Sequence, residues 1–198
     1  GQGVRLTPNE PAYLLALGAS WLKKPDVFEA ENAFRRALLI QPDNPKTQMF
    51  LGYALLQQKK YPEARGWLEK SIQKDSRTPE TFYYLGLIAQ AQNQDARAIN
   101  LFARAIALDP SFAYPHIALG SIYLKLKNYR LAQRELETAV KLKPNDSEAH
   151  YKLAMLYARL KDQKRAQAEM DVIERLKDLS NKQEAKGELV APPDPRPR

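Results

Sequence analysis

The 198-residue chain contains no cysteine, and this absence excludes disulfide scaffolds, thiol nucleophiles, iron–sulfur clusters and zinc sites built from thiolates. It has only two histidines, His116 and His150, so a histidine metal site would need a third ligand of another type. The sequence also lacks a glycine-rich phosphate loop, an HExxH motif and a GxSxG motif. These absences favour a protein that is not an enzyme and that holds no metal or cofactor.

Long apolar segments are absent as well. The mean hydropathy is −0.56, and no apolar run approaches the roughly 18 residues that a membrane span needs. Residues 1–10 have no basic start, apolar core or small-residue cleavage site, so we expect no signal peptide in this segment. A chain without cysteine suits both the cytoplasm and an exported bacterial protein, so the sequence leaves the compartment open.

Positive charge is in excess: 31 lysines and arginines stand against 23 acidic residues, for a net charge of +8. An excess of this size first suggests an acidic partner such as nucleic acid or a membrane surface. The interpretation depends on where the charges fall along the chain.

Small residues recur with a period of 34. Gly18, Gly52, Gly86 and Gly120 each follow a leucine, and Leu153–Ala154 continues the series. Twelve residues after each small residue stands an alanine, at Ala30, Ala64, Ala98, Ala132 and Ala166. The period predicts five tandem units, at residues 11–44, 45–78, 79–112, 113–146 and 147–180.

Each unit contains two helical patterns, because its apolar residues recur at spacings of three and four. Asn44–Pro45 and Thr78–Pro79 place a capping residue before a proline at a helix start. A glycine inside a helix costs about 1 kcal/mol relative to alanine, so its recurrence implies a packing reason. We expect the glycine of each unit to let the second helix cross closely, with the recurring alanine at the crossing. The chain is therefore predicted to be all-α.

The pattern resembles the tetratricopeptide repeat (TPR) family. Its signature is present in the third unit as Leu85–Gly86, Ala98, Phe102, Ala105 and Pro110. The resemblance covers residues 11–180 and implies a right-handed α-solenoid of five helix-turn-helix repeats, a scaffold that serves many partners. Residues 1–10 are then expected to form a cap or linker, and residues 181–198 a proline-rich, disordered tail. Within this region, Leu179–Glu188 is expected either to lengthen the last helix or to cap its exposed face, and Leu189–Arg198, with four prolines, to be disordered or polyproline II.

The resemblance also implies that the first helix of each repeat lines a concave groove. The groove positions are unusually apolar and hold Met49, Phe50, Tyr53, Tyr83, Tyr84, Leu87, Tyr114, Ile117, Ser121, Tyr151 and Met155. One interpretation is a surface that binds an extended peptide or an amphipathic helix of a protein partner. The other is that these tyrosines pack on their neighbours within the fold.

Basic residues recur at the turns between paired helices, at Lys59, Lys60, Lys125, Lys127, Arg159 and Lys161. This basic edge suits nucleic acid, but lysine is also favoured at a helix C-terminus by the helix dipole. No glycine-rich aromatic motif or recognition helix accompanies the edge. The pattern therefore favours an acidic segment of a protein partner over nucleic acid.

We expect a non-enzymatic protein-interaction scaffold. The alternative is a self-assembly module whose groove or terminal repeat faces bind copies of the chain, giving a homo-oligomer. His116 and His150 occupy the same place in adjacent units and are expected to pack between helices. Glu135 and Glu169 are expected to be solvated charges on the convex face.

Overall fold

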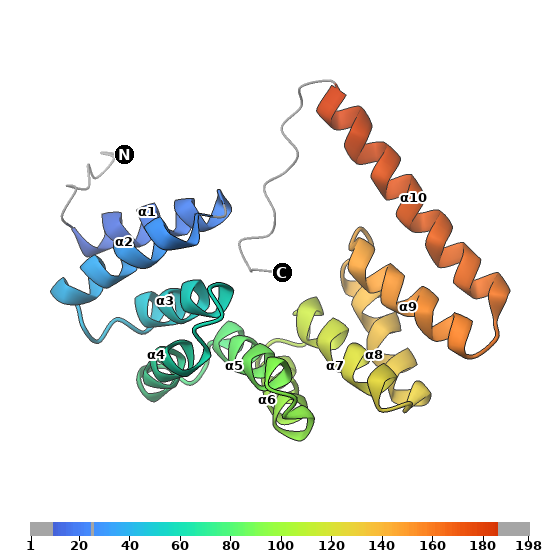
Figure 1. The fold of residues 1–198 in the computed structure, drawn as a ribbon, viewed down its shortest axis with the longest axis horizontal. Coiled ribbons are helices and arrows are strands. Elements are labelled where there is room, and N and C mark those ends of the chain that lie inside the picture. Colours follow the sequence, from blue (N-terminus) through green and yellow to red (C-terminus); the bar gives the residue numbers. More distant parts are fainter. Residues whose placement is uncertain (1–9, 25, 186–198) are drawn as a thin grey trace. The chain divides into compact units, whose positions relative to one another are not determined.

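The chain folds into consecutive helices in a computed structural model that describes residues 10–24 and 26–185 (Figure 1). Across these residues there are ten α-helices and no strand, so the predicted all-α class is confirmed. The expectations for residues 1–9 and 186–198 lie outside the described residues. The helices are α1 (Pro11–Lys23), α2 (Val27–Ile40), α3 (Pro45–Gln57), α4 (Tyr61–Lys74), α5 (Pro79–Ala91), α6 (Asp95–Leu108), α7 (Ala113–Lys125), α8 (Tyr129–Leu142), α9 (Ser147–Arg159) and α10 (Gln163–Ala185).

Every helix from α3 onward begins 34 residues after the start of the helix two places before it. Local capping explains several of these starts. The Asn44 side chain accepts a hydrogen bond from the Thr47 backbone N–H at 3.0 Å, and Asp146 caps α9 in the same way. Thr78 is also the residue before a helix-starting proline, but its side chain accepts no capping hydrogen bond. Capping and proline together set the helix starts.

The chain divides into two compact units, Gly1–Gln92 and Asn93–Arg198. The N-terminal unit contains α1 to α5 and the C-terminal unit α6 to α10. Inside each unit consecutive helices pack on one another, and the first helices of successive pairs also touch, as α1 with α3 and α7 with α9. The division falls between the two helices expected for the third repeat.

The glycines lie where a side chain would not fit. A Cβ atom on Gly52 would lie 2.6 Å from Leu68 Cγ, and one on Gly120 would lie 2.5 Å from Leu136 Cγ. The predicted close helix approach is confirmed, but the nearest atoms belong to a leucine rather than to the recurring alanine. Gly66, which does not follow the period, has no atom within 4 Å of its Cβ position. The periodic glycines therefore make room for a large side chain of the second helix.

The turns inside the last four helix pairs each contain a residue with left-handed backbone geometry. Lys59 has a φ of 60°, and Asn93, Lys127 and Lys161 have φ values of 57°, 58° and 60°. The Lys60 N–H donates to Leu55 O at 3.0 Å and the Lys59 N–H to Leu56 O at 2.9 Å, the two hydrogen bonds of a Schellman helix stop. Three of the basic turn residues therefore occupy a position that the helix-stop geometry requires.

Candidate functional site

Most of the predicted groove residues of the N-terminal unit are buried. Tyr53 and Tyr84 are 8% and 1% exposed, and their ring centroids lie 5.0 Å apart. The Gln57 amide donates to the Tyr53 hydroxyl, and burial raises the pKa of Tyr53 despite this hydrogen bond. Met49 and Tyr83 are also buried, while Phe50 and Leu87 are half-buried. Burial favours internal packing over partner contact at these positions.

Three predicted groove residues of the C-terminal unit are also engaged internally. Tyr114 and Ile117 are buried, and the Ser121 hydroxyl donates to Ile117 O at 2.9 Å. The Lys143 ammonium donates to the Tyr114 hydroxyl and lies 4.3 Å from its ring centroid. Burial lowers the pKa of Lys143, but its hydrogen bonds to Tyr114 and Asp146 outweigh burial, so the pKa is raised. Tyr114 therefore contacts a half-buried lysine that follows α8.

Tyr151 and Met155 differ from the other predicted groove residues because they are 50% and 38% exposed. They lie one turn apart on α9 and line a cavity of about 630 Å³ between α9 and α10, which we call the α9–α10 groove. Its apolar lining consists of Tyr151, Ala154, Met155, Ala158, Ala166 and Met170. Met170, on the second helix of the pair and 42% exposed, was not predicted as a site residue.

The helix α10, whose first two turns line the α9–α10 groove, is longer than the other helices. The odd-numbered helices have 13 residues and α2, α4, α6 and α8 have 14, whereas α10 has 23. Figure 1 shows α10 running back along α9 and continuing past the N-terminal end of α9. The helix thus runs beyond residue 180, where the last repeat was expected to end, and presents surface that α9 does not cover.

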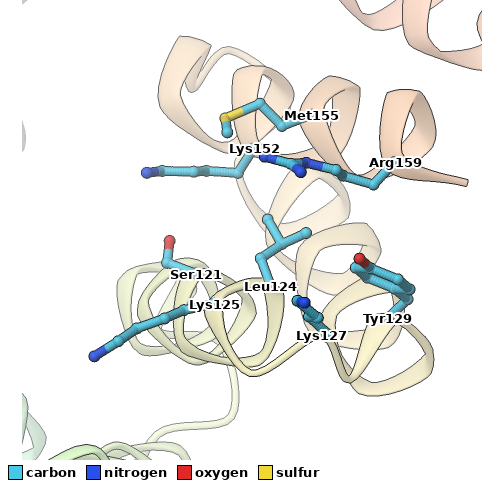
Figure 2. A pocket seen from close by; sticks show the side chains of 8 residues that line it. All are labelled: Ser121, Leu124, Lys125, Lys127, Tyr129, Lys152, Met155 and Arg159. Carbon is cyan, nitrogen blue, oxygen red and sulfur yellow. The ribbon is translucent and has the colours of Figure 1, made fainter.

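A second cavity of about 330 Å³ adjoins the groove, and we call it the basic pocket. Figure 2 shows its lining: Ser121, Leu124 and Lys125 from α7, Lys127 from the following turn, Tyr129 from the start of α8, and Lys152, Met155 and Arg159 from α9. Four of these side chains are cationic and none is acidic. Met155 lines both cavities. Lys152 and Tyr129 were not predicted, although Lys152 directly follows the predicted groove residue Tyr151.

Ion pairs neutralise part of the predicted basic edge. Lys60 Nζ lies 3.1 Å from Glu31 Oε2, and Lys125 Nζ lies 2.8 Å from Asp95 Oδ2. The other four residues of the edge make no ion pair with any residue that the structure describes; they are Lys59, Lys127, Arg159 and Lys161. Three of these four residues lie in the C-terminal unit: Lys127 and Arg159 line the basic pocket, and Lys161 lines the α9–α10 groove.

Family comparison agrees with the helix geometry. The tetratricopeptide repeat family matches residues 26–79 and 87–156, together more than half of the chain. The chain belongs to the tetratricopeptide repeat family. TPR proteins are protein-interaction scaffolds and are generally not enzymes, which supports a scaffold role with protein partners. No curated protein sequence matches the chain.

Solved structures resemble this TPR chain in fold. Pseudomonas aeruginosa PilF superposes with a TM-score of 0.76 at 20% identity, over 83% of this chain and 75% of PilF. TTC0263, a TPR protein of Thermus thermophilus, has a TM-score of 0.73 at 20% identity, over 91% of this chain and 99% of its own. YrrB, described as a TPR protein with an unusual peptide-binding site, has a TM-score of 0.60 at 16% identity, over 85% of this chain and 87% of its own.

The two histidines of this TPR chain are buried, as expected, and each pairs with a glutamate of the next helix. His116 Nδ1 lies 2.7 Å from Glu135 Oε2, and His150 Nδ1 lies 2.6 Å from Glu169 Oε2. The expectation that Glu135 is solvated was wrong, because this side chain is buried against His116; Glu169 is half-buried. Among the described residues no three His, Asp or Glu side chains are grouped to hold a metal ion, and no described helix is long and apolar enough to cross a membrane.

Proposed function

We propose that the chain is a scaffold that binds an extended peptide or an amphipathic helix of a protein partner in the α9–α10 groove. The observation that carries the proposal is the exposure of three large apolar side chains, Tyr151, Met155 and Met170, in one cavity of about 630 Å³. Clustered apolar surface is unfavourable in water, and its burial by a partner would drive binding.

The side chains of the groove suit a peptide ligand. Tyrosine offers a large contact area with a polar end, and methionine adapts to irregular partner surfaces. The groove also contains Ala154, Ala158 and Ala166. Because their side chains are short, a partner backbone could approach the helices closely. The peptide-binding site named for YrrB supports peptide recognition by this fold.

A random-peptide display selection on the full chain tests the proposal. Wild type is compared with a Tyr151→Ser/Met170→Ser groove variant and with a Phe28→Ser/Leu39→Ser control. Phe28 and Leu39 are 71% and 83% exposed, lie on α2 of the N-terminal unit and do not line the groove. We expect wild type and control to recover related peptides, and the groove variant to bind them about tenfold or more weakly in fluorescence polarisation. Equal binding to the groove variant would contradict the proposal, as would recovery of no peptide by wild type.

Self-assembly is the second candidate, favoured by exposed apolar side chains near both ends of the helical region. Phe28, Leu39 and Ile40 of α2 are more than half exposed, as is Leu179 of α10. If these faces pair, sedimentation equilibrium should give a mass that rises above 22.6 kDa with concentration, and the Phe28→Ser/Leu39→Ser variant should remain a monomer. A wild-type mass that stays at the monomer value at every concentration excludes this candidate.

A further inference from the structure

The basic pocket is lined by four cationic side chains and by no carboxylate. Its cations come from two helices and the turn between α7 and α8, and only Lys125 has an ion-pair partner, Asp95 of α6, among the described residues. Lys127, Lys152 and Arg159 make no ion pair with any residue that the structure describes. Like charges held around one cavity repel each other, so an anion placed between them would gain Coulomb energy from several at once.

The pocket also has features that select among anions. The Arg159 guanidinium can donate two parallel hydrogen bonds to one carboxylate, while the lysines act as point charges. Leu124 and Met155 supply apolar surface beside the cations. The combination suits the carboxylate of an aspartate or glutamate whose methylene groups lie against apolar side chains.

The position of the pocket links it to the α9–α10 groove. Met155 lines both cavities, so a peptide in the groove would place neighbouring residues in the pocket. We infer that the basic pocket binds acidic side chains of the partner, and that the scaffold selects peptides in which Asp or Glu lies close to a large apolar residue. This inference rests on the proposed groove function and specifies which side chains the partner peptide must carry.

The distribution of charge favours an acidic peptide over nucleic acid. Nucleic-acid binding requires a row of phosphate contacts along a surface. Glu31 and Asp95 neutralise Lys60 and Lys125, which interrupts the basic edge within each unit. Of the edge cations without an ion pair, Lys127 and Arg159 line the basic pocket and Lys161 lines the neighbouring α9–α10 groove, and this arrangement matches a short mixed acidic and apolar segment.

The same display selection tests the inference. The frequency of Asp and Glu in the recovered peptides is compared between wild type, a pocket variant and a control. The pocket variant is Lys127→Gln/Lys152→Gln/Arg159→Gln. The charge-matched control is Lys141→Gln/Lys164→Gln/Lys177→Gln, at exposed positions that do not line the pocket. We expect peptides recovered by wild type and control to be rich in Asp and Glu beside apolar residues, and those recovered by the pocket variant to keep only the apolar residues.

A second measurement uses the wild-type protein alone and so does not depend on the folding of a variant. The most enriched peptide is compared with a copy in which each Asp or Glu is replaced by its amide. The amide copy should bind about tenfold more weakly, and the difference should shrink when salt is raised from about 50 mM to about 500 mM.

The outcomes separate the two proposals. Recovery of apolar peptides without acid enrichment overturns the inference and leaves the groove function standing. Recovery of no peptide overturns both. If a short single-stranded DNA binds wild type more tightly than the best peptide and loses affinity on the pocket variant, the pocket belongs to nucleic acid and the inference is wrong.

Discussion

His116 Nδ1 lies 2.7 Å from Glu135 Oε2, and the same pair recurs 34 residues later between His150 and Glu169. Each pair joins the first helix of a repeat to the second, α7 to α8 and α9 to α10. Glu135 also accepts two hydrogen bonds from Arg134. The helix pairs of the C-terminal unit that carry the groove and the pocket are thus connected by polar contacts, one buried and one partly buried, as well as by apolar packing.

The pairing of Glu135 predicts acid sensitivity. Burial, the largest influence, raises the pKa of Glu135, but the hydrogen bonds from His116 and Arg134 outweigh it and leave the pKa below the ordinary value of 4.5. A carboxylate with a lowered folded-state pKa stabilises the fold fully above its unfolded value, and this contribution is lost as the pH falls through the folded-state pKa. Urea denaturation should therefore show a loss of stability below about pH 4.5.

The variant Glu135→Gln tests the source of that pH dependence. It should lower the free energy of unfolding at pH 7 by about 1–3 kcal/mol and flatten its decline at acid pH. Glu174→Gln, at an exposed position of α10, is the control and should leave both quantities close to wild type. An acid transition in Glu135→Gln as steep as that of wild type would show that other carboxylates cause it.

The glycine contacts predict opposite effects of the same substitution. Gly120→Ala would bring a Cβ within 2.5 Å of Leu136, and we expect it to destabilise the fold by about 1–3 kcal/mol. Gly66→Ala meets no atom within 4 Å and should stabilise it by about 0.5–1 kcal/mol through helix propensity. Thermal and urea denaturation of the two variants measure the difference. A Gly120→Ala protein as stable as Gly66→Ala would refute the close approach of α7 and α8.

The left-handed turn at Lys59 predicts a stabilising substitution. A side chain at a φ of 60° costs about 1 kcal/mol that glycine avoids. Lys59→Gly should therefore raise the midpoint of urea denaturation, whereas Lys59→Ala, which removes the charge and keeps the side-chain clash, should not. A gain in both variants would mean that charge, not backbone geometry, limits stability at this turn.

Burial predicts different consequences for two tyrosines that lie on the first helices of their repeats. Tyr84 is 1% exposed, so Tyr84→Ala should lower the free energy of unfolding by about 3 kcal/mol or more. Tyr151 is 50% exposed, so Tyr151→Ala should change it by only about 0.5 kcal/mol while weakening peptide binding. Measurements of stability and affinity on both variants separate core residues from partner contacts. A stable Tyr84→Ala protein with weakened peptide binding would show that Tyr84 contacts the peptide and is not a core residue.

Much of the fold could be predicted from the sequence because its signals are local and repeated. The 34-residue spacing of small residues and prolines places the helix starts, and the repeating glycine marks the close crossing. The atom that fills the crossing could not be predicted, because it depends on how far the second helix rotates. Only the folded structure shows Leu136, rather than the recurring alanine, packed against Gly120.

The candidate site was less predictable. Groove positions were inferred from a repeat pattern that does not distinguish an exposed Tyr151 from a buried Tyr84, since burial depends on the neighbouring repeat. Met170 was missed because the groove positions were taken from the first helix of each repeat, whereas Met170 lies on a second helix. The histidine–glutamate pairs had a usable signal: both pairs have the same 19-residue separation, at the same places of two successive repeats.

The three methionines of the chain allow the central claim, peptide binding in the α9–α10 groove, to be measured directly. Met155 and Met170 line the groove, whereas Met49 is buried in the N-terminal unit at 6% exposure. In a protein labelled with ¹³C at the methionine methyl groups, a saturating display-selected peptide should shift the NMR signals of Met155 and Met170 and leave that of Met49 in place. A shift of Met49 alone, or no shift at saturation, would contradict the account.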